Sequence, residues 1–358
     1  MILNEEVFLS LVRLGIGNTR EVSSLPKYLD WTELADLMLR HGLTAIIVDG
    51  IEKLSDDQRP PKELLLQWIG ETLQGYEFRY KQYKKAISEL AGFYNTHGYK
   101  MMVIKGYACC LDWPRPEHRP CGDIDVWLFG HNKDADVLLA HEKGIGIDRG
   151  HHHHTIFEWE GFLIENHYDF LNIHQHKSNI LLENSLKELA KDDTHFTVIY
   201  GEKVYLPSAN LHALFLLRHA MTHFASSEIN VRQLLDWAFF VKAHSREIDW
   251  KWLMGVMNEF GMTKMFNIIN AICVEDLGFE VSSFPTARFE PWLKERVLKD
   301  ILSPEFSMKE PNSFFGRALF KYKRWRKNRW KHEICFNDSL WSAFWTGFVG
   351  HLLKPKSI

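Results

Sequence analysis

The sequence predicts an α+β fold, in which a small unit of strands and helices lies between two helical segments. Two observations support this prediction. Over residues 61–97 apolar residues recur at alternating three- and four-residue steps, the period of one helix face. From residue 100 short apolar runs and alternation typical of strands follow, and from residue 208 the helical period returns. The chain therefore divides into residues 1–97 (helical), 98–207 (strands with helices), 208–310 (helical) and 311–358 (tail).

The composition indicates a globular chain. Hydrophobic residues make up 46% and charged residues 25% of the 358 positions, which excludes a mainly disordered protein. The formal net charge of -3 gives no overall attraction to nucleic acid, so such binding would need a local patch. The five cysteines lack CxxC spacing and fit a reduced, cytoplasmic setting. The first residues are acidic where a secretion signal is basic, and no stretch reaches the roughly 18 apolar residues of a membrane span.

The periodic segments predict the following elements. The helix over residues 61–97 should end at Gly98, because glycine takes the left-handed conformation that closes many helices, and its apolar stripe from Leu66 to Tyr94 is interpreted as a packing face. We then expect a strand at 100–104, a strand at 122–128, a helix at 134–143, a hairpin of residues 155–160 and 162–170 turning near Gly161, and a strand at 204–206. Further helices are expected from Ser208 or Asn210 through Phe224, at 231–244 and at 250–260.

The predicted strand GDIDVWL carries the central chemical signal. Side chains alternate along a strand, so Asp123 and Asp125 point to one face and Ile124 and Val126 to the other. The Cα atoms of these two residues would lie roughly 6.6 Å apart, a span that a divalent cation bridges. Mg²⁺ prefers such oxygen ligands and usually binds substrate phosphates as well. A solvated edge strand with two exposed acids is the alternative interpretation.

Residues upstream of this strand favour a phosphate-binding site. Lys105 and Gly106 end the preceding strand, and a glycine there lets the backbone approach a phosphate closely. Arg115 and Arg119 come shortly before the two acids. Arginine neutralises phosphate oxygens bidentately.

The downstream strand FLIENHYDF supplies a third acid. Alternation places Glu165, His167 and Asp169 on one face. Three acids on neighbouring strands are what a two-metal site needs for in-line displacement at phosphorus. Glu165 is the expected third carboxylate, Asp169 is its alternative, and His167 is a candidate for contact with the substrate.

The motifs K-G, R-x-x-G-D-I-D-V, I-E-x-H and, on predicted helices, H-A-x-x-H and R-x-L-L-D follow one another in this order. Over about residues 60–245 they resemble the uncharacterised bacterial nucleotidyltransferase family of the polymerase-β superfamily. The resemblance implies a minimal nucleotidyltransferase domain, a small mixed sheet with helices, flanked by N-terminal helices and followed by a helical domain. It also implies that Asp123 and Asp125 ligate Mg²⁺ or Mn²⁺, and that Glu165 holds the catalytic ion and helps to deprotonate the acceptor.

The same resemblance implies how the nucleoside triphosphate, ATP or another, is bound. The backbone around Gly106 and Gly122 would cradle the phosphates. Where the superfamily has a glycine-serine turn, this chain has Gly106 followed by Tyr107, with Lys105 before them. Lys105 or Arg119 would then supply the missing contact.

Other polar groups have structural alternatives. Residues 151–154 are four histidines, interpreted as an exposed run, with a soft-metal site as the alternative. Arg232 and Asp236 are one helical turn apart and predict an internal ion pair, although Asp236 could instead orient the acceptor. One helical face is interpreted as a polar stripe facing the catalytic cleft, with zinc binding as the alternative. This face carries His212, His219 and His223.

The tail combines basic and apolar character. Residues 316–333 interleave Lys and Arg with aromatic side chains, and an apolar stretch follows at 339–353. A helix docked on the helical domain is the favoured interpretation. A helix lying in a membrane surface, which would make the protein membrane-peripheral, and nucleic-acid binding are the alternatives.

Together these features predict a metal-dependent nucleotidyltransferase. It would move a nucleoside monophosphate from a nucleoside triphosphate to a hydroxyl or phosphate acceptor, and the slightly acidic charge favours a saccharide or small molecule over nucleic acid. One alternative is a DxD glycosyltransferase using a nucleotide sugar, which requires a doubly wound strand-helix series before the DxD. The other is a non-catalytic, antitoxin-like module that binds a nucleotide or metal.

Overall fold

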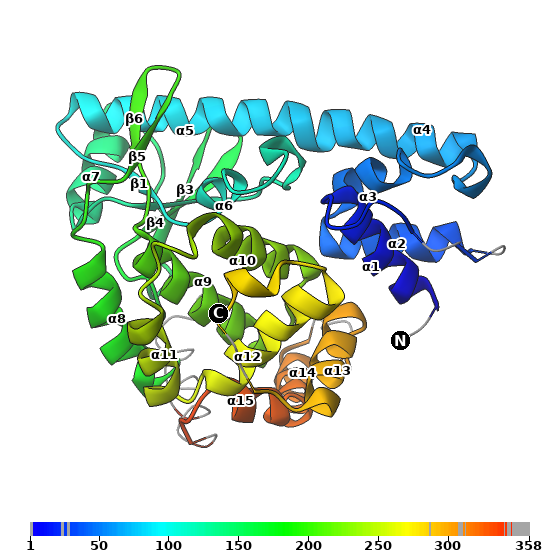
Figure 1. The fold of residues 1–358 in the computed structure, drawn as a ribbon. Coiled ribbons are helices and arrows are strands. Elements are labelled where there is room, and N and C mark those ends of the chain that lie inside the picture. The colour runs from blue at the N-terminus through cyan, green and yellow to red at the C-terminus, as the bar shows by residue number, and fades with distance from the viewer. Residues whose placement is uncertain are drawn as a thin grey trace.

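The computed structural model describes residues 3–22, 25–26, 29–285, 288–306, 311, 313–339, 341 and 345 (Figure 1). The chain forms a six-stranded mixed sheet in the order β3-β4-β2-β1-β6-β5. β2 pairs parallel with β4 and antiparallel with β1, and β1 pairs parallel with β6. The strands are β1 (Met102–Val103), β2 (Ile124–Trp127), β3 (His154–Trp159), β4 (Phe162–His167), β5 (Phe196–Ile199) and β6 (Glu202–Tyr205).

The sheet confirms the predicted α+β class. β1, β2, the β3–β4 hairpin and β6 all overlap the segments expected to be strands, although β4 ends at His167 and not at residue 170. β5 was not predicted. It is an edge strand whose Phe196 and Val198 are exposed, so a burial period does not mark it in the sequence.

One long helix runs along the upper side of the molecule in Figure 1. It comprises α4 (Lys62–Glu71), a π-helical stretch (Thr72–Phe78) and α5 (Arg79–Thr96). The predicted helix over residues 61–97 is confirmed, and Gly98 follows it with φ +79°. Its apolar stripe is a packing face in α5, where Tyr83, Ile87, Leu90 and Tyr94 are buried.

In the first half of this helix the predicted packing face is wrong. Leu66 and Leu73 are exposed, while Trp68 is buried. The reason is that α4 extends past the sheet and meets the N-terminal helices instead (Figure 1). The Trp68 ring lies 6.2 Å from that of Trp31 on α2. These N-terminal helices are α1 (Leu3–Gly15), α2 (Trp31–His41) and α3 (Thr44–Ile51).

The two faces of the sheet belong to two different hydrophobic cores. Val103, Ile124 and Val126 pack with α5 and with α7 (Asn132–Lys143). Met102 and Trp127 point the other way and join the large core of the helical domain. Because side chains alternate along a strand, the acidic side chains of β2 and β4 share this second face.

The helical domain covers that face of the sheet. Its helices are α8 (Lys177–Leu189), α9 (Ala209–Ser226), α10 (Val231–His244), α11 (Trp250–Glu259), α12 (Thr263–Ala271) with a π-helical end (Ile272–Asp276), and α13 (Pro291–Leu302). α9, α10 and α11 are the helices predicted at these positions. Ser208 occupies the N-cap position of α9, but its side chain makes no capping hydrogen bond. At α10 a capping box joins Asn230 and Gln233 and fixes the first turn of that helix.

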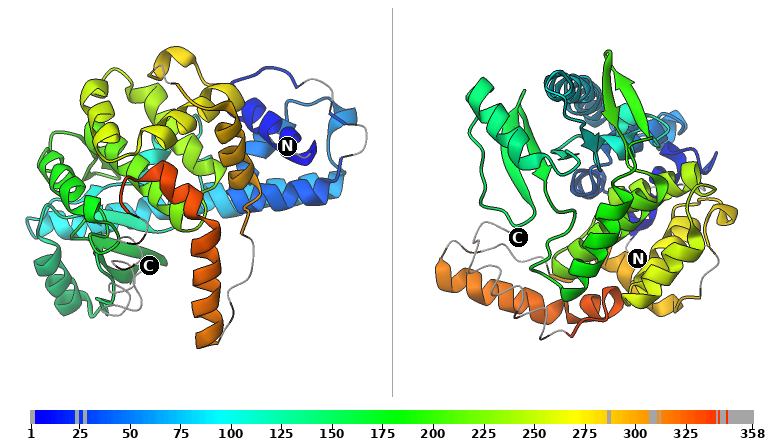
Figure 2. Two further views of the ribbon diagram at one scale, coloured as in Figure 1. Left: turned by 90° about the horizontal axis from the view of Figure 1, so that it is seen from below. Right: turned by 90° about the vertical axis from the view of Figure 1, so that its left-hand side faces the viewer.

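The tail divides into two helices. α15 (Arg329–Cys335) packs against α9 and α12, and its buried Lys331 lies 2.5 Å from Asp300. α14 (Phe314–Lys327) extends away from the body of the protein in Figure 2. The predicted apolar stretch at 339–353 lies largely outside the described residues. Within the described chain, none of the helices combines the length and apolar character needed to cross a bilayer.

Shorter elements complete the described chain. The helix α6 (Tyr107–Cys110) follows Gly106 directly. Three 3₁₀ turns lie at Asp56–Gln58, Pro116–His118 and Val281–Ser283.

Candidate active site

Two carboxylates meet where β2 and β4 run side by side. The parallel register pairs Asp125 with Glu165 and Trp127 with His167. Paired residues of neighbouring strands point to the same face, so Asp125, Glu165 and His167 all face the helical domain. The predicted clustering of carboxylates from separate stretches of chain is present.

Two basic groups hold these carboxylates in one network. Lys105 Nζ lies 2.7 Å from Asp125 Oδ1, and His167 Nε2 lies 3.2 Å from the same oxygen and 3.5 Å from Glu165 Oε2. The side chain of Asp125 is fully buried, yet its Oδ2 has no hydrogen-bond partner among the described residues. The network therefore leaves one buried carboxylate oxygen unsatisfied.

The charges of this network follow from its contacts. Burial alone would raise the pKa of Asp125, but Lys105 and His167 outweigh it and hold that pKa well below its ordinary value. Burial alone would lower the pKa of His167, but the hydrogen bonds to Asp125 and Glu165 raise it to about 9. At neutral pH the side chains of Lys105, His167 and Asp125 are all charged.

Asp123 stands just before β2 and lines the adjoining cavity. The charge of Asp125, and then burial, raise the pKa of Asp123 above its ordinary value. Its backbone carbonyl accepts a 2.8 Å hydrogen bond from the hydroxyl of Tyr83. That hydroxyl would lie 2.5 Å from a Cβ at Gly106, which has φ +43°. Glycine at 106 thus permits the close approach of two segments that border the cavity.

A cavity of about 450 Å³ opens between the sheet, α9 and α10. Its walls carry cationic, acidic and imidazole groups together. Among the lining residues are Lys105, Gly106, Arg119, Gly122, Asp123, Glu165, His167, His219, Arg232 and Asp236. A volume of several hundred Å³ is typical of small-molecule sites.

The predicted pairing of Arg232 with Asp236 is replaced by a longer-range one. Asp236 accepts hydrogen bonds from Arg119 at 2.7 and 2.9 Å and from the Trp113 indole at 3.0 Å. Arg232 lines the cavity, and its Nε is buried without a hydrogen-bond partner. The sequence presented Arg232 only as an ion-pair partner, so it is a cavity cation that the motif analysis missed.

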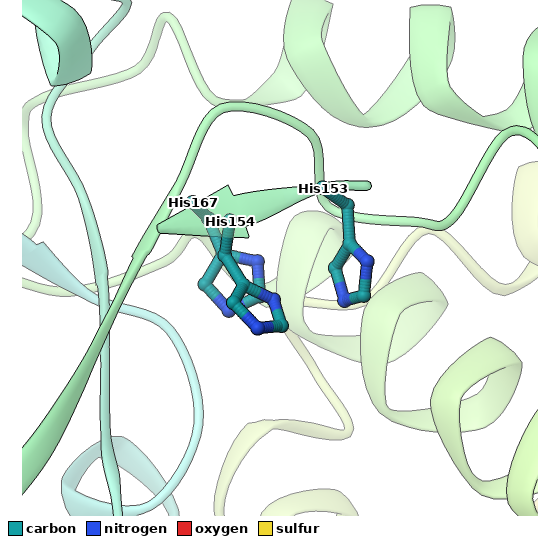
Figure 3. A group of neighbouring side chains, drawn as sticks. All are labelled: His153, His154 and His167. Carbon is teal, nitrogen blue, oxygen red and sulfur yellow. The ribbon is translucent and has the colours of Figure 1, made fainter. Parts of the chain in front are cut away.

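The histidine run is not exposed, contrary to the prediction. His152 and His154 are buried, and His153 and His154 line the cavity. The run turns inward because β3 starts at His154, whose partner across the hairpin is His167 at the end of β4 (Figure 3). Imidazoles of this run therefore lie next to Glu165, whose Oε2 is 3.8 Å from His154 Nδ1.

The helical histidine stripe faces the cavity in part. His219 and His223 line the cavity, and their Nε2 atoms are 3.2 Å apart. Burial, and then the charge of Lys105, lower the pKa of His223 to about 4. His212 is buried elsewhere, with its Nε2 3.7 Å from Cys109 Sγ.

Two other candidates point away from the cavity. The carboxylate of Asp169 is paired with Lys187, while its backbone carbonyl lies 3.1 Å from His167 Nδ1. Asp169 therefore does not join Asp123 and Asp125 as the third carboxylate of the site, because β4 ends before Asp169. Tyr107 is buried against Tyr80, with ring centroids 6.3 Å apart.

A protein-family model and a solved structure are similar to parts of this chain. A sequence model of the family named uncharacterised nucleotidyltransferase matches residues 27–278, more than two thirds of the chain. An antigenic nucleotidyltransferase-like protein from Paracoccidioides brasiliensis is similar in structure, with 14% identity, coverage of 56% of this chain and 94% of that chain, and a TM-score of 0.35. No curated protein matches the chain. All residues that line the cavity fall within the family match.

Proposed function

This chain belongs to the uncharacterised nucleotidyltransferase family, and from that premise we propose that it transfers a nucleoside monophosphate from a nucleoside triphosphate to a small acceptor in the cavity. The observation that carries the proposal is the parallel pairing of Asp125 with Glu165 beside Lys105. Before β2 the described residues form helices and the two-residue strand β1, not the doubly wound series that the glycosyltransferase alternative requires.

The acidic residues fit a divalent cation. Asp123, Asp125 and Glu165 offer carboxylate oxygens to one region, and one of them, Asp125 Oδ2, is buried without a hydrogen-bond partner. These three would hold Mg²⁺ or Mn²⁺, which prefer oxygen ligands. Such an ion, when bound, neutralises phosphate charge and activates the attacking oxygen.

The cationic side chains of the cavity would bind the triphosphate. Lys105 is 19% exposed and can turn from Asp125 toward a phosphate once another cation balances that carboxylate. Arg232 supplies a guanidinium whose Nε has no hydrogen-bond partner in the described part of the chain. Guanidinium groups bind phosphate bidentately, whereas an ammonium acts as a point charge. The backbone at Gly106 lines the same cavity.

In the proposed reaction an acceptor oxygen attacks the α-phosphorus. The bond from that phosphorus to the bridging oxygen breaks, and pyrophosphate leaves. Glu165 would accept the proton of an acceptor hydroxyl. Burial alone would raise the pKa of Glu165, but the hydrogen bond from His167 outweighs it and lowers the pKa, so Glu165 is ionised and able to accept. The remaining catalysis is positioning and charge neutralisation.

A small acceptor fits the site. The cavity of about 450 Å³ is of the size of small-molecule sites, and the net charge of -3 gives no general attraction to nucleic acid. A saccharide or another small hydroxyl compound is therefore the proposed acceptor class.

The test compares Glu165→Gln with a matched control. The protein is incubated with Mg²⁺, each labelled nucleoside triphosphate and a panel of small acceptors, and label transfer and pyrophosphate release are measured. Glu165→Gln should abolish transfer and keep most nucleotide binding, while Glu158→Gln, an exposed glutamate on the neighbouring strand β3, should behave as wild type. Equal transfer by Glu165→Gln would refute the assignment. Nucleotide binding without turnover in the wild type would favour the non-catalytic module.

A further inference from the structure

Three imidazoles converge at the open end of the β3–β4 hairpin. His154 and His167 are cross-strand partners, and His153 is the residue before β3. Their ring centroids are 4.3 Å (His153–His154), 5.2 Å (His154–His167) and 5.6 Å (His153–His167) apart. One nitrogen of each ring lies within 4.8 Å of the other two. Figure 3 shows the three rings grouped on one side of the strand end.

The backbone fixes two of these side chains. The carbonyl of His153 accepts hydrogen bonds from the backbone N–H groups of Tyr168 and Asp169, both at 3.0 Å. In return the carbonyl of Asp169 lies 3.1 Å from His167 Nδ1. With the Nδ1 proton donated to this carbonyl, Nε2 becomes the ligating nitrogen of His167 once a metal ion displaces the proton that Nε2 otherwise holds toward Asp125 and Glu165. Metal-binding histidines are commonly oriented by such a contact.

The other two rings lack the partners that buried imidazoles normally have. His154 is 6% exposed, and neither of its nitrogens has a hydrogen-bond partner among the residues that the structure describes. The Nδ1 of His153 is also buried without one. Most buried polar atoms in proteins are hydrogen-bonded, so these nitrogens, in side chains that line the cavity, are available to bind a ligand.

We propose that His153, His154 and His167 bind a divalent transition-metal ion of the zinc class, at a site that adjoins the carboxylate site of the proposed function. The two sites adjoin because His167 Nε2 lies 3.2 Å from Asp125 Oδ1 and 3.5 Å from Glu165 Oε2. Imidazole nitrogens suit Zn²⁺, Co²⁺ and Ni²⁺, whereas Mg²⁺ prefers oxygen. Three protein ligands leave a fourth position open, as in zinc sites that bind water or substrate. That position faces the cavity, because His153, His154 and His167 all line it.

The test is Co²⁺ binding to the full chain in the absence of nucleotide. Co²⁺ is titrated into metal-free protein, and uptake is followed by calorimetry and by the visible absorption of tetrahedral Co²⁺, with and without excess Mg²⁺. One equivalent should bind, and Mg²⁺ should not displace it. His167→Gln and His154→Gln should each weaken binding by about 100-fold, since loss of even an outer-shell partner costs 10–100-fold. His141→Gln, exposed on α7, is the control and should bind as wild type.

His167→Gln separates the folded site from chelation by the histidine run alone. His167 lies outside residues 151–154, so undiminished Co²⁺ binding by a folded His167→Gln would overturn the proposal. Glutamine keeps an amide donor beside Asp125 and Glu165, and thermal unfolding verifies that the variant is folded. His154→Gln repeats the test at a residue that borders Glu165, with its Nδ1 3.8 Å from Glu165 Oε2. Absence of the Co²⁺ band in wild type would also overturn the proposal. Because nucleotide is omitted, failure here leaves the transfer assay unaffected.

Discussion

Two ion networks border the same cavity and differ in how fully their carboxylates are satisfied. On the helical side, both oxygens of Asp236 accept hydrogen bonds, from Arg119 and Trp113. On the sheet side, Asp125 Oδ1 contacts both Lys105 Nζ and His167 Nε2, while Asp125 Oδ2 has no hydrogen-bond partner among the described residues. Both carboxylates are almost completely buried.

This difference separates a structural carboxylate from one that can bind a ligand. A buried carboxylate with both oxygens paired has no remaining acceptor for a cation, and its main effect is to hold Arg119 in place. A buried carboxylate with an unpaired oxygen, next to two other acids, can exchange a protein cation for a metal ion. We therefore expect substitutions in the first network to affect stability and substitutions in the second to affect turnover.

The largest expected effect is that of Asp125→Asn on transfer. This change removes a carboxylate of the proposed cation site and should lower kcat by on the order of 10³-fold, as removal of a key electrostatic group does in other enzymes. Its unfolding free energy should fall less than that of Asp236→Asn, because Lys105 can turn toward Glu165 and the cavity. Steady-state transfer rates and urea unfolding measure the two effects. A variant with wild-type turnover would contradict the distinction.

The second largest expected effect is that of Asp236→Asn on the free energy of unfolding. Asp236→Asn leaves the buried guanidinium of Arg119 without its counterion, which should lower the unfolding free energy by about 3–5 kcal/mol. Urea unfolding measures this, and nucleotide transfer at a temperature where the variant is folded should change much less than in Asp125→Asn.

The matched control for this prediction is the double variant Arg119→Met/Asp236→Leu. Replacing both ions by apolar side chains removes the uncompensated charge, so the double variant should be more stable than Asp236→Asn. If the double variant is the less stable of the two, the pair contributes to stability beyond charge compensation.

The sequence could predict the local parts of the site and not the long-range ones. The pattern GDID predicts Asp123 and Asp125 on one face of a strand, and this expectation needed no distant partner. In the structure Asp125 lies within β2 and Asp123 stands just before it. The partnership of Arg119 with Asp236 spans 117 residues and depends on how α10 packs on the loop before β2. The four-residue spacing on a helix predicted Arg232 as the partner of Asp236. Local periodicity carries no information on distant partners such as Arg119.

The same limit applies to the histidines and to the helices. The burial of residues 151–154 depends on a hairpin register that starts β3 at His154, one residue earlier than expected. The exposure of Leu66 depends on α4 extending beyond the sheet, which its apolar stripe does not reveal. The sequence therefore predicted elements and one acidic face, whereas tertiary packing determined which side chains reach the cavity.

The third prediction concerns pH. His167 has a pKa of about 9 in the folded protein, above the ordinary 6.5, so its protonated form stabilises the fold. This stabilisation is fully present below about pH 6.5 and is lost as the pH rises through about 9, and it amounts to about 3 kcal/mol. Urea unfolding in metal-free buffer between pH 6 and 9.5 measures it.

Two variants show whether this pH dependence belongs to the sheet-side network. His167→Gln should remove it. Asp236→Asn should retain it, because the guanidinium of Arg119 stays protonated over this range. Wild-type stability that is flat between pH 6.5 and 9 would mean that the imidazolium does not bridge Asp125 and Glu165 in solution.

The smallest expected effect is that of Arg232→Met on nucleotide binding. Arg232 borders both networks but, unlike Arg119, has a buried Nε without a partner, so it is a cation available to a phosphate. Its loss should raise KM for the nucleoside triphosphate by about tenfold, equivalent to one charge-assisted hydrogen bond of about 1.4 kcal/mol, with little change in stability. Arg115→Met is the control, because Arg115 is paired with Asp49 and Glu77 away from the cavity. An unchanged KM in Arg232→Met would show that an unpaired cavity cation is not sufficient to identify a phosphate contact.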